Sequence, residues 1–207
     1  MKRINLFQVA TLLLCVAIIV LVYATNAGKP SDNAQQAVID NIFARRSVRS
    51  YLPNRPVGRD TLQLLAKVGM AAPSGKNVQP WAFVAVTERA TLDSLAAKLP
   101  YAKMLKDAPA AMIVCGDTSK DSKELWVLDC SAATQNILLT AEALGLGAVW
   151  TAAYPYVDRM ATVAQVLGLP ANIIPLCVVP IGYPDPDGSE LPKDKWRSEN
   201  LKWEKWQ

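Results

Sequence analysis

The chain has 207 residues, of which 51% are hydrophobic and 19% are charged, and its formal net charge is +4. This size and balance describe a globular protein with room for one domain and exclude an intrinsically disordered chain, while the modest charge gives no support to nucleic-acid binding. The sequence has no histidine and no C-x-x-C pair among its four cysteines, which excludes histidine-based catalytic triads and argues against a metal site or a redox dithiol.

An apolar segment opens the chain. Lys2 and Arg3 precede an uncharged run at residues 6–24, which is about as long as the roughly 20 residues that span a membrane. Small residues follow, so cleavage near Ala24 or Ala27 and retention as an anchor are both open. Because the basic end stays in the cytoplasm, we expect the domain to be exported or anchored outside the cytoplasm; a cytoplasmic location is the alternative.

The expected organisation is a signal peptide or membrane anchor at residues 1–27, a linker at 28–33, and one domain at 34–207. Within that domain, a C-terminal arm begins at about residue 185. Gly28 and Pro30 place the linker outside regular structure. Periodicity then predicts a helix to about residue 45 with Val38, Ile42 and Phe43 on its buried side. The next elements expected are a helix from Asp60, a strand at 81–87 and a helix at 91–99.

The second half of the domain continues this alternation. The elements expected in chain order are a strand at 110–115, a long helix at 123–144, a strand at 148–152, a helix at 158–168 and a strand at 174–181. Gly145 and Gly168 are suited to ending the two helices. Pro175 and Pro180 predict irregular or edge positions for the ends of the last strand. The pattern favours an α+β fold, with a mixed β-sheet sandwiched by helices.

Residues 45–49 (RRSVR) are the first candidate for chemistry. Three guanidinium groups and a hydroxyl within five residues suit a phosphate monoester, because arginine offers paired donors to phosphate oxygens. A solvated basic helix end is an equally good interpretation of these residues alone.

Residues 72–81 (APSGKNVQPW) are the second candidate. They form a tight loop between a helix and a strand, and such a loop exposes amides that suit the edge of a flat heterocycle. By composition alone, an ordinary turn before a buried tryptophan explains the loop better. The pair Gly145 and Gly147 is no dinucleotide-binding motif, because these glycines end a helix and precede a strand.

The C-terminal region combines basic residues with tryptophans. Lys193 and Lys195 can be read as a solvated tail. Trp196, Trp203 and Trp206 need an apolar surface to cover, so we expect an arm that packs on a neighbouring subunit.

In this order and spacing, the stretches resemble the nitroreductase family of FMN flavoproteins. The resemblance extends from about residue 38 to residue 206. It rests on RRSVRSY, GMAAPSGKNVQPWAFV, DCSAATQNILLTAEALGLGAVW, PLCVVPIGYP and the PKDKW tail. An N-terminal hydrophobic helix is not typical of that family.

The resemblance implies a set of cofactor contacts. Arg45, Arg46 and Ser47 would bind the phosphate and ribityl chain of FMN, and Arg49 would lie near the pyrimidine edge of the flavin. The loop that reaches FMN from the other subunit in this family corresponds here to Pro73, Ser74, Gly75 and Asn77. The strand end that lies against the ring corresponds to Trp150, Thr151 and Ala152. The C-terminal basic pair corresponds to Lys193 and Lys195. The family architecture implies a homodimer with FMN at the subunit interface.

The implied activity passes reducing equivalents from NAD(P)H through FMN to nitroaromatic, quinone or similar electron-poor acceptors. NAD(P)H would be a transient donor, and no protein residue is expected to act as a catalytic acid or base, because the flavin N5 performs the chemistry. We expect no metal. The alternative is an exported flavin-binding module without turnover, a carrier or sensor. A purely structural envelope protein is a third hypothesis.

Overall fold

The computed structural model describes residues 13–18, 32–120, 125–188 and 191–206. The chain divides into two compact units, Met1–Asp40 and Asn41–Gln207. In the first unit residues 13–18 are helical, and most of the apolar run at 6–24 lies outside the described residues. Of the described helices, none combines the length and apolar character that crossing a bilayer requires. The signal peptide or anchor and the linker therefore stay predictions.

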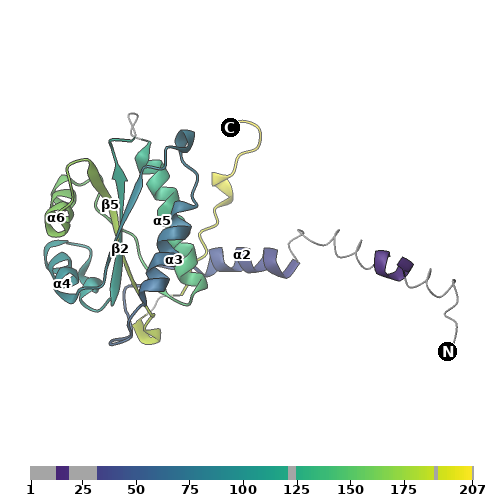
Figure 1. Cartoon of the computed structure of the whole chain (residues 1–207), viewed down its shortest axis with the longest axis horizontal. Coiled ribbons are helices and arrows are strands. Elements are labelled where there is room, and N and C mark those ends of the chain that lie inside the picture. The colour runs from purple at the N-terminus through teal and green to yellow at the C-terminus, as the bar shows by residue number, and fades with distance from the viewer. Residues whose placement is uncertain (1–12, 19–31, 121–124, 189–190, 207) are drawn as a thin grey trace, which may run out of the picture. The chain divides into compact units, whose positions relative to one another are not determined.

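A five-stranded sheet forms the centre of the second unit (Figure 1). Its strands are β1 (Trp81–Val86), β2 (Ala110–Asp117), β3 (Gly147–Ala148), β4 (Thr151–Ala152) and β5 (Ile173–Gly182). The order is β1-β2-β5-β3, and β4 also pairs with β5. All four ladders between these strands are antiparallel, so the expectation of a mixed sheet is wrong for them. Parallel pairing in the described residues is confined to the isolated bridge between Ser47 and Ala148.

Helices cover both faces of this sheet. α3 (Arg59–Met70) and α5 (Trp126–Ala143) lie on one face, while α4 (Arg89–Lys98) and α6 (Val157–Leu167) lie on the other (Figure 1). The central strand β2 alternates between two cores. Met112 and Val114 belong to the core that includes α3 and α5, whereas Ile113 and Cys115 belong to the core that includes α4 and α6. The α+β architecture with helices on both faces is confirmed.

The third predicted strand is broken in two. β3 and β4 are separated by Val149 and Trp150, and both parts pair with β5. This break also accommodates Pro180, which was expected at an irregular or edge position and lies inside β5, a strand with neighbours on both sides. β3 pairs as far as Ile181 and β4 begins at Val178, so Pro180 falls opposite the gap between them.

Pro175 is accommodated differently. It pairs with Cys115 beside the register shift between Val114 and Cys115. Leu176, the next residue of β5, has no partner in β2, so Pro175 lies beside a bulge in its own strand. Neither proline marks an edge strand, and both lie at irregular positions of the pairing.

The helix α2 (Asp32–Ala44) has the predicted bounds to within one residue but not the predicted burial. The side chains expected on its buried side are 61%, 48% and 75% exposed, for Val38, Ile42 and Phe43 respectively. A helical repeat identifies an apolar face, but it does not say whether that face is covered by the same chain. Gly145 and Gly168 do follow the ends of α5 and α6, with the positive φ values of 69° and 63° that favour glycine.

Candidate functional site

The segment at residues 45–51, called here the arginine segment, is fixed by its backbone. Val48 N donates to Ala148 O at 3.0 Å, and Ser47 forms a parallel bridge with Ala148. The approach is close enough to require glycine at position 147. A Cβ there would lie 2.5 Å from Val48 Cγ1. The arginine segment therefore lies directly against β3.

Tyr51 anchors the other end of the arginine segment. Its side chain is 3% exposed, and its hydroxyl lies 2.9 Å from Val48 O and 3.3 Å from Pro180 O. Burial raises the pKa of the Tyr51 hydroxyl well above its ordinary value, and the charge of Arg49 opposes that shift. The hydroxyl therefore stays protonated and acts as a donor to these carbonyls.

The chain that follows β5 leaves the sheet beside the arginine segment. Leu52 N donates to Tyr183 O at 2.9 Å, and Asp185 N donates to Ser50 O at 3.0 Å. Ser50 Oγ also donates to Asp185 Oδ2 at 3.2 Å. These bonds direct the C-terminal residues toward the arginines, although the two regions are far apart in the sequence.

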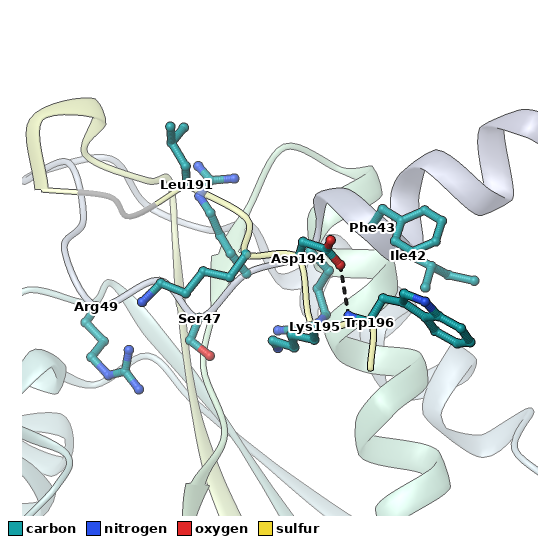
Figure 2. A pocket seen from close by; sticks show the side chains of 11 residues that line it. Ile42, Phe43, Ser47, Arg49, Leu191, Asp194, Lys195 and Trp196 are labelled. Atoms are coloured by element: carbon teal, nitrogen blue, oxygen red, sulfur yellow. Dashed lines mark hydrogen bonds between the residues drawn. The ribbon is translucent and has the colours of Figure 1, made fainter. Parts of the chain in front are cut away.

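A first cavity of about 520 Å³ lies between these two regions. Figure 2 shows Ser47, Arg49 and Lys195 around it, with Ile42, Phe43 and Trp196 on one side of the view. The cavity is lined by Ile42, Phe43, Arg45, Arg46, Ser47, Arg49, Leu191, Lys193, Asp194, Lys195 and Trp196. The structure thus brings together the predicted phosphate contacts from both ends of the domain. Their role in holding a phosphate stays a prediction.

The charge in the first cavity is strongly positive. Asp194 is the single acidic side chain among its described lining residues, and its Oδ1 accepts a hydrogen bond from Trp196 N at 2.9 Å. Arg46 Nη1 lies 3.6 Å from Glu142 Oε1 on α5, which holds that guanidinium in place. Arg46 Nε is buried and has no hydrogen-bond partner in the described part of the chain. An unpaired buried donor among basic neighbours is suited to an anionic ligand.

A second cavity of about 630 Å³ adjoins the first, because Arg49 lines both. It contains the predicted strand-end residues Trp150, Thr151 and Ala152. Its lining also includes residues that sequence reasoning missed, namely Tyr101, Lys103, Met104, Tyr156 and Arg159. No local motif marks these residues, since they come from the turn after α4 and the start of α6. Only the folded structure shows that these two segments meet at one cavity.

The predicted loop contacts lie elsewhere on this chain. Pro73, Ser74, Gly75 and Asn77 line neither of the two cavities. Gly75 N donates to Asp129 Oδ1 on α5 at 3.0 Å, which fixes the loop to that helix. The structure alone thus leaves this loop outside the cavities formed by one chain.

The loop nevertheless has an unusual backbone. Lys76, Asn77 and Gln79 have positive φ values of 54°, 58° and 53°. Such positions are costly for residues with a side chain and often occur at functional sites. Gln79, which sequence reasoning did not single out, stabilises the loop by donating from its N to Ser74 Oγ and from its Nε2 to Asn77 Oδ1.

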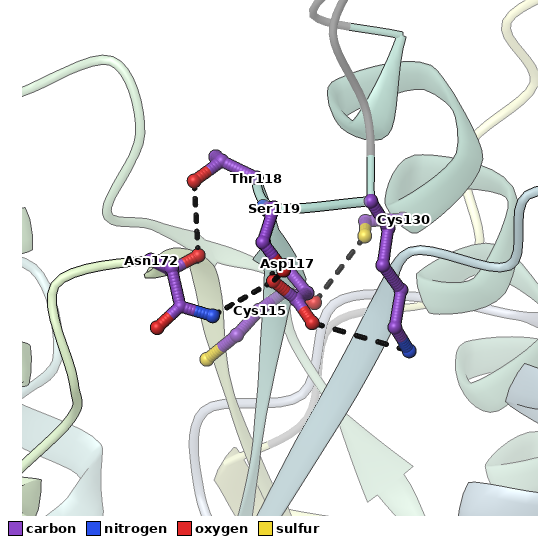
Figure 3. A network of polar contacts seen from close by, with 7 residues as sticks. Cys115, Asp117, Thr118, Ser119, Cys130 and Asn172 are labelled. Carbon is purple, nitrogen blue, oxygen red and sulfur yellow. Dashed lines mark hydrogen bonds and ion pairs between the residues drawn. The ribbon is translucent and has the colours of Figure 1, made fainter.

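The cysteines of the domain take no part in either cavity. Cys115, Cys130 and Cys177 are fully buried, as expected of small apolar residues. Burial raises the pKa of the Cys115 and Cys177 thiols to about 12. Figure 3 shows the hydrogen bond from Cys130 Sγ to Cys115 O beside a polar network around Asp117. That network joins the end of β2 to the residue before β5, so its place is structural.

Known proteins resemble this chain over most of its length. A family model described as the nitroreductase family matches residues 42–100 and 92–183. A relative from Archaeoglobus fulgidus, named provisionally as an NADH dehydrogenase/NAD(P)H nitroreductase, is 40% identical over 168 residues, which cover 80% of this chain and 96% of that protein.

Solved structures give the same result. A crystal structure from Bacteroides thetaiotaomicron with the same provisional name is 55% identical, has a TM-score of 0.78, and the match covers 82% of this chain and 98% of the other. A structure from Desulfovibrio desulfuricans, provisionally named a nitroreductase, is in complex with FMN. It is 30% identical with a TM-score of 0.69, over 82% of this chain and 98% of the other.

Proposed function

The chain belongs to the nitroreductase family of oxidoreductases, and from that premise we propose that it binds FMN across the two adjoining cavities and takes electrons from NAD(P)H. One observation carries this proposal. Arg49 lines both the cavity formed by the two basic regions and the cavity that contains Trp150, Thr151 and Ala152. A phosphate in the first cavity and a flat ring system in the second would belong to one ligand.

The residues of the first cavity suit a phosphate monoester. Arg45, Arg46 and Ser47 offer donors on one side, and Lys193 and Lys195 offer donors on the other. A charge-assisted hydrogen bond contributes about 1.5–3 kcal/mol, so a few of them would retain the cofactor firmly. A nearby anion would also stabilise the charged side chain of Arg46, whose buried Nε has no hydrogen-bond partner among the described residues.

The second cavity suits the redox-active ring. Arg49 and Lys103 place two positive charges along its lining, and a positive charge beside the pyrimidine edge favours the reduced state of a flavin. When bound, FMN supplies the chemistry, accepting two electrons from the nicotinamide and passing them to a nitroaromatic, a quinone or a similar electron-poor acceptor. The chain's own residues then serve to bind, orient and tune it.

We further propose that the active form is a homodimer in which Pro73, Ser74, Gly75 and Asn77 approach the FMN of the partner subunit. The positive φ values in this loop support a functional role, and the loop lines neither cavity of its own chain, which is why we assign that role to the partner's site. Apolar side chains that need covering support an interface, namely Ile42, Phe43, Leu128, Leu191, Trp196, Trp203 and Trp206, which are each 48% or more exposed. Light scattering on the purified protein should give the mass of two chains.

The compartment belongs to the proposal as well. The apolar run at residues 6–24 behind Lys2 and Arg3 supports export or anchoring of the domain outside the cytoplasm. The mass of the native N-terminus distinguishes a cleaved signal from a retained anchor. Finding the intact chain in the soluble cytoplasmic fraction would contradict both.

An absorbance spectrum of the purified full chain, with nicotinamide titrated in, tests the central function. We expect a flavin spectrum that bleaches on adding NADPH or NADH and returns when an electron-poor acceptor is added. A yellow protein that nicotinamide does not bleach would instead support a flavin-binding module without turnover. A colourless protein that takes up no added FMN would contradict the proposal.

A further inference from the structure

Arg159, on the first turn of α6, is held rigidly at the second cavity. Its guanidinium carbon lies 3.7 Å from the centre of the Tyr156 ring and 4.9 Å from that of Tyr101. Its Nη1 donates to Ala152 O at 3.3 Å, which ties it to the strand end β4. Two aromatic rings and a backbone carbonyl thus fix the orientation of one cation beside the predicted flavin position.

The charge of Arg159 is not neutralised by the protein. No carboxylate occurs among the described residues that line the second cavity, and the described residues form no ion pair with Arg159. Its chain neighbour Asp158 does not line the cavity. Arg159 Nε is buried and unpartnered within the described part of the chain. Since Arg159 is partly buried and has no carboxylate partner among the described residues, an anionic ligand group would stabilise this arrangement.

The surroundings of Arg159 are open on the side of the cavity. Tyr101 is 69% exposed and Tyr156 is 47% exposed, so the rings that flank the guanidinium still offer apolar surface to a ligand. A comparable stack, Arg55 over Tyr183 at 3.4 Å, lines neither cavity. The position of Arg159, rather than the stack itself, is what suggests recognition of a ligand.

We propose that Arg159 selects an electron acceptor that carries a carboxylate on a flat conjugated ring, with Tyr101 and Tyr156 flanking that ring. The inference rests on the proposed function, because it assigns Arg49 and Lys103 to the flavin and leaves Arg159 for the second ligand. A guanidinium can donate two parallel hydrogen bonds to one carboxylate, which a neutral acceptor of the same shape cannot accept with equal strength.

Two matched acceptors test the proposal, 4-nitrobenzoate and its neutral counterpart 4-nitrobenzamide. With the full chain in detergent and loaded with FMN, kcat/KM should be higher for the carboxylate. Arg159→Gln should lower that preference about tenfold or more, because KM for 4-nitrobenzoate rises. The kcat/KM for 4-nitrobenzamide should change little. Arg55→Gln removes the comparable stack away from the cavities and should keep the preference of the unmodified protein.

An equilibrium measurement gives a readout without turnover. Benzoate should perturb the spectrum of the oxidised flavin at lower concentration than benzamide, and Arg159→Gln should remove this difference. An equal loss of kcat/KM for both acceptors in Arg159→Gln would overturn the proposal and indicate a structural role. A rise in KM for the nicotinamide alone would overturn it as well and indicate a contact with the electron donor.

The role of Arg159 and the proposed function can be tested separately. A yellow, active protein with equal kcat/KM for the two acceptors would overturn the role of Arg159 and leave the proposed function intact. A protein that binds no FMN would overturn both.

Discussion

The arginine segment and the tail at residues 191–206 line the same cavity, yet they are held in different ways. In the arginine segment Val48 and Tyr51 are buried, and backbone bonds join it to β3 and to the residues after β5. Every described residue of the tail is exposed. The comparison teaches that one half of the site is fixed by buried side chains and backbone bonds of the same chain, while the other half is formed by exposed residues.

The largest expected effect lies in the rigid half. Replacing Arg45 and Ser47 together by alanine should weaken FMN binding about 100-fold, because two phosphate contacts are lost while the bonds of Val48 and Tyr51 remain. A fluorescence titration with FMN measures the change. Arg55→Ala is the control, since Arg55 lines neither cavity. Unchanged flavin affinity in the double variant would place the phosphate elsewhere.

A change that moves the rigid half without touching a phosphate donor should come next. Gly147→Ala forces Val48 away from β3 and should cost about 1–3 kcal/mol in the free energy of unfolding, together with partial loss of FMN. Gly58→Ala is the matched control, because the nearest atom to a Cβ there is 4.0 Å away. Urea unfolding measures the free energy of unfolding of both variants. Equal values would show that the arginine segment tolerates displacement.

The exposed half should show a smaller effect that depends on salt. Lys193→Gln combined with Lys195→Gln should weaken FMN binding about tenfold at low ionic strength and less at high ionic strength, because exposed charges are screened. Titrations at two salt concentrations measure this. If the loss were as large as for the arginine segment and independent of salt, Lys193 and Lys195 would not act as exposed charges and the comparison would be wrong.

The smallest effect on the cofactor is expected at Asp117. Hydrogen bonds from Ser119 and Asn172 lower the pKa of its carboxyl (Figure 3). Asp117 pairs with the first residue of β5, whereas the arginine segment lies beside the other end of that strand. The stabilisation is present above the ordinary carboxyl pKa of about 4 and is lost as the pH falls through the lowered value. Asp117→Asn should therefore be less stable than the unmodified chain at neutral pH, with a difference that narrows in acid. FMN affinity should not change.

The sequence predicted the larger elements of the fold well, because they depend on local signals. Apolar repeats and terminal glycines identified α5 and α6, and the strands β1, β2 and β5 were each expected at nearly their observed positions. The break between β3 and β4 was not predicted, since it arises from pairing with a distant strand. Pro175 and Pro180, which were expected at irregular or edge positions, lie at irregularities in the pairing of β5 and not at an edge of the sheet.

The candidate site followed the same division. The basic residues at both ends of the domain could be identified by type, and the structure shows that they meet at one cavity. Lys103 and Arg159 could not be identified, because neither belongs to a recognisable motif: Lys103 follows α4, and Arg159 lies on the first turn of α6. The exposure of Ile42 and Phe43 was also not predictable, since a helical repeat identifies an apolar face but does not say whether the same chain covers it.

The affinity for FMN compared with riboflavin, which lacks the phosphate, tests the account most directly. We predict that the unmodified protein binds FMN at least about 100-fold more tightly, as expected for two or more charge-assisted contacts. The Arg45→Ala and Lys193→Ala variants should each reduce that ratio while leaving riboflavin affinity unchanged. Equal affinities for FMN and riboflavin in the unmodified protein would contradict the claim that the basic residues from both ends of the domain hold one phosphate.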